Sequence, residues 1–212
     1  TEGKRAKVVG IADAPGDRFV FSLFEAGEIW VVDASDPRRP AVRKFRNVGK
    51  EPYDGLITTD GRWYIAGLFG EDGLALLDLW QPEQGTRRVL EGYGRGQEPL
   101  PVYKMPHLQS WAFTEGQYAL PAVGRHEILW VERDSQATVA STAVHGQPVF
   151  IIAQPASPYV WVNFATPLND TVQVVDSPGA SVVTAQVTVP SIRSMTRTLV
   201  RVTLPVLVTV TV

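Results

Sequence analysis

The stretch F-V-F-S-L-F-E-A-G-E-I-W-V-V-D, Phe19 to Asp33, decides the fold. Its aromatic and β-branched residues form two short runs, and a polar turn containing a glycine separates them, which is typical of a β-hairpin that ends on an acid. The same unit recurs three times: W-Y-I-A-G-L-F-G-E-D-G-L-A-L-L-D (63–78), Q-Y-A-L-P-A-V-G-R-H-E-I-L-W-V-E (117–132) and Y-V-W-V-N-F-A-T-P-L-N-D-T-V-Q-V-V-D (159–176).

The four closing acids recur at intervals of about 45 residues, and the interval that contains a Gly-rich insert at 91–101 is longer. A short apolar run precedes each hairpin, and a more variable run follows three of them, at 41–45, 86–90 and 137–141. Three clear strands and a ragged fourth indicate an all-β protein, a β-propeller with four-stranded blades, of which about four are visible. A β-sandwich with accidental similarity is the weaker alternative, because the hairpin-plus-acid unit recurs in register.

The chain divides by pattern into propeller blades at 1–176 and an atypical tail at 177–212. The tail is rich in Val and Thr and has none of the acids or aromatics of the blades. Its composition is compatible with strands of a further blade, and we assign it no function.

Composition excludes several classes of function. The net charge of −2 argues against a broad electrostatic grip on nucleic acid, and the absence of cysteine excludes disulfides, thiolate metal sites and a thiol nucleophile. No Ser-His-Asp order, zinc-ligand spacing or paired-carboxylate motif stands out, so the sequence assigns no catalytic residue and no metal site.

The propeller fold predicts where a ligand would bind. The loop that leads into the first strand of a blade, here called the mouth loop, opens on the same face as the turn between its second and third strands, here called the mouth turn. The side chains that could contact a ligand on this face are Arg5, Arg46, Tyr53, Lys104, His107, Gln109, His126, His145 and Gln147. The Lys and Arg content of the mouth loops predicts a basic funnel for a ligand with several carboxylates or phosphates.

Each of these residues also has a purely structural interpretation. A single histidine more often bonds neighbouring backbone or an acid than a ligand, and we favour that reading for each histidine taken singly. Lysine and arginine are by default a solvated rim, the strand-end acids are expected to cap turns, and the aromatics are expected to be blade core.

Several segments are similar to one known family. These are K-V-V-G-I-A-D-A-P-G-D (7–17), E-P-Y-D-G-L-I-T-T-D-G (51–61), L-P-V-Y-K-M-P-H-L (100–108), V-G-R-H (123–126) and H-G-Q-P-V-F (145–150). They resemble the NirF family of heme d1 biosynthesis proteins, and the resemblance covers about residues 3 to 176, matching the later part of the family's chain.

The resemblance implies that the blades belong to an eight-bladed ring like the d1 domain of cytochrome cd1 nitrite reductase. It implies a periplasmic protein that binds heme d1 or dihydro-heme d1, as ligand or substrate, late in heme d1 biosynthesis. The implied partners are other heme d1 maturation proteins and cytochrome cd1 nitrite reductase. A dehydrogenase step, a membrane anchor outside this chain and a homodimer are left open. The family's iron-ligating histidine lies in the earlier half of its chain, so no residue here is assigned that role.

Two other functions remain as alternatives. One is a non-catalytic propeller scaffold that docks maturation partners through its face. The other is the d1 domain of a nitrite reductase itself.

Overall fold

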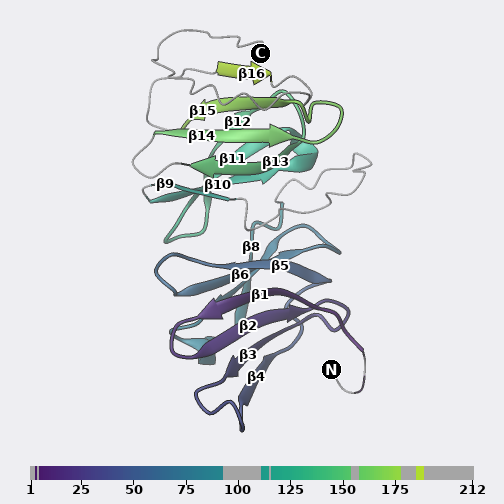
Figure 1. The fold of residues 1–212 in the computed structure, drawn as a ribbon, viewed down its shortest axis with the longest axis vertical. Coiled ribbons are helices and arrows are strands. Elements are labelled where there is room, and N and C mark those ends of the chain that lie inside the picture. The colour runs from purple at the N-terminus through teal and green to yellow at the C-terminus, as the bar shows by residue number, and fades with distance from the viewer. Residues whose placement is uncertain are drawn as a thin grey trace, which may run out of the picture. The chain divides into compact units, whose positions relative to one another are not determined.

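The computed structural model describes residues 3, 5–92, 111–114, 116–153, 158–177 and 185–188, the last four by their backbone. They form four antiparallel sheets of four strands, each built from strands consecutive along the chain (Figure 1). The chain divides into two compact units, residues 1–109 and 110–212, and each is described by itself. The prediction of an all-β protein built from four-stranded blades is confirmed.

Unit 1 contains two blades. Blade 1 consists of β1 (Val8–Ala14), β2 (Arg18–Leu23), β3 (Glu28–Asp33) and β4 (Ala41–Phe45). Blade 2 consists of β5 (Pro52–Ile57), β6 (Trp63–Leu68), β7 (Leu74–Asp78) and β8 (Thr86–Val89), with a short 3-10 turn, η1 (Pro82–Gln84), before its last strand.

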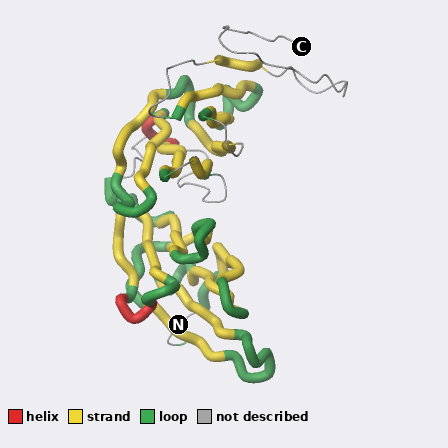
Figure 2. Tube along the Cα trace, turned by 90° about the vertical axis from the view of Figure 1, so that its left-hand side faces the viewer, coloured by secondary structure: helices red, strands yellow, loops and turns green. Residues whose placement is uncertain are grey.

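Unit 2 contains the other two blades. Blade 3 consists of β9 (Ala112–Thr114), β10 (Gln117–Ala122), β11 (Glu127–Glu132) and β12 (Thr138–Ala143), with the 3-10 turn η3 (Val123–Arg125) between β10 and β11. Blade 4 consists of β13 (Pro148–Ala153), β14 (Tyr159–Phe164), β15 (Thr171–Asp176) and β16 (Ala185–Thr188). Figure 2 shows these strands joined by loops, with the two short helical turns in red.

The strands follow the alternation of apolar side chains expected for sheets that stack face to face. In β2, Val20 and Ser22 are buried whereas Phe19 is exposed. All five residues of β7 are buried, and this strand lies inside the sheet of blade 2, between β6 and β8. The buried core of unit 1 contains residues from both blades, among them Val20, Ile29, Val31, Tyr64, Leu68, Leu77 and Leu79.

The two blades of unit 1 meet at their inner strands, β1 and β5. Gly10 has a φ of +58°, and a Cβ atom there would lie 2.6 Å from the carbonyl oxygen of Tyr53. The buried hydroxyl of Tyr64 donates a hydrogen bond to the carbonyl of Gly10 (2.7 Å) and lies 3.0 Å from Ser22 Oγ. Burial raises the pKa of Tyr64, so the phenol stays neutral and serves as a donor between the blades.

Unit 2 has its own core, which also draws on both of its blades. Trp130 is fully buried, and its indole Nε1 donates to Thr142 Oγ1 on the neighbouring outer strand (3.0 Å). Ile151 of β13 and Val160 and Val162 of β14 pack in the same cluster. The inner strand of blade 4 therefore packs through aliphatic side chains, whereas unit 1 uses glycine and a tyrosine hydroxyl.

The sequence predicted that Asp33, Asp78 and Asp176 cap the turns that follow the third strands. The structure confirms this for Asp33 and Asp78 and adds Glu132, while the role of Asp176 stays a prediction. Asp33 Oδ1 accepts the N–H of Ser35 (2.9 Å), Asp78 Oδ1 accepts that of Trp80 (2.9 Å), and Glu132 Oε1 accepts that of Asp134 (2.9 Å). Hydrogen bonds from Ser35 lower the pKa of Asp33, and those from Asp134 and Ser135 lower the pKa of Glu132. These carboxylates have a structural role in the turns.

Part of the segment interpreted as a tail belongs to blade 4. Strand β16 pairs antiparallel with β15, with Val172 opposite Val187 and Gln173 opposite Gln186, and it completes the four-stranded sheet. The remainder of 177–212 lies outside the described residues, except for Ser177, whose N–H donates to the carbonyl of Pro158 (2.8 Å). In the part of the chain that the structure describes, no helix has the length and apolarity needed to cross a membrane.

Candidate functional site: the mouth loops and mouth turns

The mouth loop and mouth turn lie side by side in both blades of unit 1. In blade 1 the N–H of Phe24 donates to the carbonyl of Lys7 (3.0 Å), and in blade 2 the N–H of Phe69 donates to that of Glu51 (2.9 Å). Each phenylalanine is the first residue after the second strand of its blade. The repeat therefore brings equivalent segments to the same end of each sheet.

A glutamate from each mouth turn clamps the mouth loop of its own blade. Glu25 Oε2 accepts the backbone N–H of Lys7 (2.7 Å), and Glu71 Oε1 accepts that of Lys50 (2.7 Å). Glu25 Oε1 also lies 2.9 Å from Lys7 Nζ. The hydrogen bonds from Lys7 lower the pKa of Glu25 to about 2, so this clamp is charged at neutral pH.

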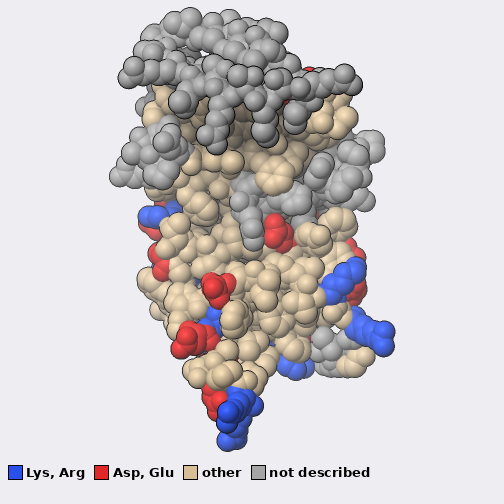
Figure 3. All heavy atoms as spheres, in the orientation of Figure 1, with Lys and Arg blue, Asp and Glu red and all other residues tan. Residues whose placement is uncertain are grey.

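Several cations at this end of unit 1 are paired with acids. Arg46 Nε lies 3.8 Å from Glu28 Oε1, and Arg88 Nη1 lies 3.1 Å from Glu71 Oε1. Figure 3 shows Lys and Arg interleaved with Asp and Glu along the right-hand edge of unit 1. Glutamates from the mouth turns and from the start of β3 therefore offset part of the positive charge of Lys7, Arg46 and Arg88, and the basic funnel stays a prediction.

Three aromatic rings gather at the mouth end of unit 1. The ring of Tyr53 lies 5.8 Å from that of Phe24, in an edge-to-face arrangement, and 6.0 Å from that of Phe69. Phe24 and Phe69 are themselves 5.7 Å apart, and Lys7 Nζ lies 4.6 Å from the Phe24 ring centre. Tyr53 is the second residue of β5 and is 39% exposed. These three residues are called the aromatic cluster below.

Of these three residues, only Tyr53 was predicted from the sequence as a ligand contact; Phe24 and Phe69 were not. Phenylalanines in the hairpins were interpreted as blade core, whereas both of these are only partly buried. Aligning the first two hairpins by their closing acids would have shown a phenylalanine at the same position in both, directly before the acidic turn.

His145 lies in the mouth loop of blade 4, and its ring is held by that blade. Nδ1 lies 2.9 Å from Gln173 Oε1, and Nε2 lies 3.2 Å from Thr171 Oγ1, both on β15. The ring packs on Phe164 at the end of β14, with centroids 4.1 Å apart. Both ring nitrogens thus contact side chains of β15, so His145 links the mouth loop of blade 4 to this strand.

The other proposed ligand contacts in unit 2 also lie at the mouth ends of their blades. His126 follows η3 with left-handed backbone (φ 56°), and its carbonyl accepts the N–H of Val144 (2.9 Å). Gln147 directly precedes β13, and its carbonyl accepts the N–H of Ala165 (2.9 Å). The mouth turn of blade 3 also holds an ion pair, from Arg125 Nη2 to Glu127 Oε2 (3.0 Å).

The remaining candidates divide into two groups. Arg5 is exposed in the loop before β1, and Arg46 is exposed directly after β4. Lys104, His107 and Gln109 lie outside the described residues, as does the rest of the mouth loop of blade 3. Among the residues that are described, no group of three His, Asp or Glu side chains is placed to hold a metal ion.

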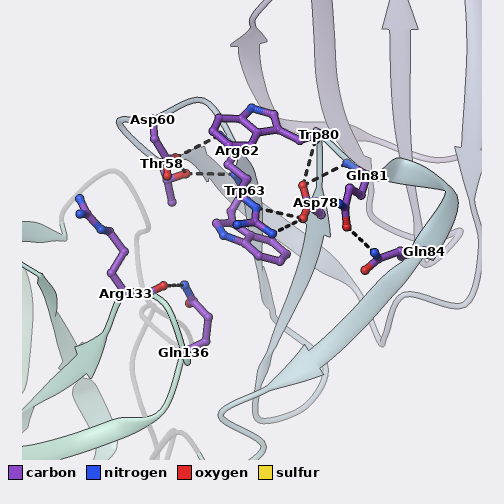
Figure 4. A network of polar contacts seen from close by, with 10 residues as sticks. All are labelled: Thr58, Asp60, Arg62, Trp63, Asp78, Trp80, Gln81, Gln84, Arg133 and Gln136. Carbon is purple, nitrogen blue, oxygen red and sulfur yellow. Dashed lines mark hydrogen bonds and ion pairs between the residues drawn. The ribbon is translucent and has the colours of Figure 1, made fainter.

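A different network occupies the end of blade 2 opposite to its mouth turn (Figure 4). Arg62 bonds Asp78 Oδ2 through Nε (3.0 Å) and Nη2 (2.9 Å), and its guanidinium lies 4.7 Å from the ring centre of Trp63 and 5.6 Å from that of Trp80. Burial opposes ionisation of Asp78, but the Arg62 guanidinium and the N–H groups of Trp80 and Gln81 outweigh it and lower its pKa. This network ties the β5–β6 turn to the end of β7, and we assign it to stability.

The fold and the mouth geometry define a β-propeller whose blades present loops and turns at one end. A comparison with known protein families identifies the family: the model of the cytochrome D1 heme domain matches residues 1–199. The chain belongs to this family.

Two curated relatives carry the same name. Over 176 residues the chain is 54% identical to Protein NirF of Pseudomonas aeruginosa, covering 83% of this chain and 45% of that protein. It is 50% identical to Protein NirF of Stutzerimonas stutzeri over 174 residues, covering 82% of this chain and 44% of that protein. The chain therefore spans about half the length of the curated relatives it matches.

Solved structures share the fold at low sequence identity. The dihydro-heme d1 dehydrogenase NirN, solved in complex with DHE, has a TM-score of 0.62 at 22% identity, covering 84% of this chain and 40% of that one. A streptogramin B lyase has a TM-score of 0.56 at 14% identity, and the match covers 87% of this chain and 55% of the lyase chain. These similarities support the propeller architecture.

Proposed function

We propose that the protein binds a d1-type tetrapyrrole, heme d1 or dihydro-heme d1, during late heme d1 biosynthesis for cytochrome cd1 nitrite reductase. The observation that carries the proposal is membership of the cytochrome D1 heme domain family over nearly the whole chain. The identity to two NirF proteins supports the biosynthetic role. We further propose an eight-bladed ring, a periplasmic location and partners among the maturation proteins and the nitrite reductase.

The mouth face of unit 1 fits the periphery of such a ligand. A tetrapyrrole is a flat apolar ring with carboxylate side chains, so it needs aromatic contact area and cationic donors nearby. Tyr53 offers an exposed ring, and Lys7 and Arg46 are more than half exposed at their side chains, 68% and 53%. Residues of this chain would hold the macrocycle and orient it, and the tetrapyrrole would supply the redox chemistry.

The described histidines contribute to the proposal as neighbours of the ligand. Because both ring nitrogens of His145 contact Thr171 and Gln173, we propose that His145 shapes the mouth loop near the ligand and does not ligate the iron. We propose the same peripheral role for His126, Gln147, Arg5 and Arg46, and for Lys104, His107 and Gln109 of the blade 3 mouth loop.

A spectral titration tests the proposal. Purified full-length protein is titrated with extracted heme d1, and in parallel with dihydro-heme d1, while the Soret and long-wavelength bands are followed. Binding shifts and sharpens these bands saturably, whereas unchanged spectra at saturating pigment would rule the proposal out and leave the scaffold function. Titrating residues 1–212 beside the full-length protein measures how much affinity these blades provide.

A further inference from the structure

The aromatic cluster of unit 1 is not required by the blade fold. The first residue after the second strand is Phe24 in blade 1 and Phe69 in blade 2, and the same position holds Val123 in blade 3 and Ala165 in blade 4. In blade 4 this residue makes the same backbone hydrogen bond to its mouth loop as the two phenylalanines make. Val123 and Ala165 are 2% and 5% exposed, so a small aliphatic side chain satisfies the position.

Burial does not account for the rings either. Phe24 and Phe69 are partly exposed, Tyr53 is exposed, and none of the three belongs to the buried core of unit 1. Leaving aromatic surface in water forgoes the stabilisation that full burial would give. A cluster of three rings drawn from both blades at the ligand-facing end is therefore better explained by a ligand than by packing.

The surrounding contacts fix the position of the cluster. The Glu25–Lys7 and Glu71–Lys50 hydrogen bonds, each 2.7 Å, lock both mouth turns onto their mouth loops. At the base of Tyr53, its carbonyl lies so close to Gly10 that no side chain fits there. The rings thus stand on a backbone that is held from both blades, which lowers the ordering cost of binding.

From this geometry we propose that Tyr53 is a ligand-positioning residue that packs against the macrocycle, and that Phe24 and Phe69 support its ring and extend the apolar contact. This inference rests on the proposed function and deepens it, because it assigns the contact to one cluster on unit 1. The edge-to-face packing of Phe24 on Tyr53 fixes the tyrosine ring, which leaves its exposed side for a flat ligand. Lys7, beside Phe24, is placed to meet a carboxylate at the edge of the same ligand.

The test compares variants of the full-length protein in the heme d1 titration. Tyr53→Ala is expected to raise the Kd about tenfold, the value of one lost aromatic contact, and to move the band positions of the bound pigment. Tyr53→Phe keeps the ring and is expected to bind within about threefold of the wild type. Phe24→Leu and Phe69→Leu are expected to raise the Kd by about threefold to fivefold, because they loosen the tyrosine.

Trp80→Ala is the matched control. Trp80 is an even more exposed ring, 60% exposed, but it follows β7 at the end opposite to the mouth turn. The Kd of Trp80→Ala is expected to lie within about twofold of the wild-type value. Circular dichroism checks that every variant is folded.

The outcomes separate the two proposals. If the wild type binds heme d1 and Tyr53→Ala binds it equally well with the same spectrum, the aromatic cluster is not the contact and the proposed function stands. If Tyr53→Phe raises the Kd as much as Tyr53→Ala does, the hydroxyl and not the ring makes the contact, which also overturns the inference. If the wild type itself does not bind, the proposed function fails and the inference fails with it.

Discussion

Units 1 and 2 have the same four-stranded blades with mouth loops and mouth turns, but different side chains stand at equivalent positions of these segments. Unit 1 places phenylalanines at the start of both mouth turns and clamps both turns with glutamates. Unit 2 places Val123 and Ala165 at the same positions and holds one mouth loop through His145. The backbone hydrogen bonds between mouth loop and mouth turn occur in both units and so belong to the blade. The side chains at these positions differ, and we propose that those of unit 1 serve a ligand.

The largest predicted effect concerns Gly55 on the inner strand β5, which makes room for the ring of Tyr64 on the neighbouring strand β6. Any Cβ atom at Gly55 would overlap the Tyr64 ring and hydroxyl, so Gly55→Val is expected to lower the free energy of unfolding by about 3 kcal/mol. Urea denaturation measures the change. The matched variant in unit 2, Ile151→Val, removes one methylene from a buried aliphatic position and is expected to cost about 1 kcal/mol. Equal costs would contradict the distinction between the two inner-strand interfaces.

The next effect concerns the capping acids. Asp78→Asn removes the charged partner of Arg62 and is expected to lower the free energy of unfolding by about 2 kcal/mol at pH 7. Because the pKa of Asp78 is lowered from 3.8 in the folded protein, its contribution is present above about pH 4 and is lost as the pH falls. The difference in urea midpoint between wild type and variant should therefore be larger at pH 7 than at pH 3.

The unit 2 counterpart sharpens that measurement. Glu132 caps its turn through the N–H groups of Asp134 and Ser135, and Glu132→Gln is expected to cost less stability than Asp78→Asn because no arginine pairs with this cap. A cost as large as that of Asp78→Asn would mean that the arginine pair adds nothing to the cap.

The third prediction concerns the first residue of the mouth turn, which is a phenylalanine in unit 1 and an aliphatic residue in unit 2. Val123 is buried, so Val123→Phe overpacks unit 2 and is expected to cost about 1.5 kcal/mol of unfolding free energy. Phe24→Val in unit 1 is expected to cost less, about 1 kcal/mol, because the ring it removes is only partly buried. Differential scanning calorimetry on both variants checks the order, and a larger cost for Phe24→Val would make that ring a core residue.

The smallest effect concerns His145. His145→Ala removes the ring that contacts Gln173 and Thr171 and is expected to lower the free energy of unfolding by about 1 kcal/mol. The position of the bound pigment's bands is expected to stay unchanged, because the ring nitrogens contact the protein. Loss of the iron-dependent bands with unchanged stability would instead identify His145 as an iron ligand.

Much of the architecture could be read from the sequence because the hairpin recurs. The positions of the second and third strands of each blade follow from four aromatic-led runs that end on an acid. Two of those acids, Asp33 and Asp78, cap turns as predicted. The outer strand β16 was harder to place, because Ala185 to Thr188 lie in a segment whose composition differs from every other blade.

The candidate site was less predictable, because it depends on pairings across the blades. The lysines and arginines of the mouth loops were visible in the sequence, but the glutamates that pair with them come from turns about 20 residues away, and strand register brings the two together. The sequence could show that Phe24 and Phe69 are equivalent, but only the structure shows that both rings contact the ring of Tyr53.

By itself the sequence determined the repeating blade, its turn-capping acids and the resemblance to a heme d1 family, because these depend on local periodicity and on identity along the chain. Only the tertiary structure decided that several cations at the mouth of unit 1 are paired with acids, that its three rings form one cluster, and that both nitrogens of His145 are held by β15. Those features arise when residues far apart in the chain meet at one end of a sheet, and no local pattern encodes that meeting.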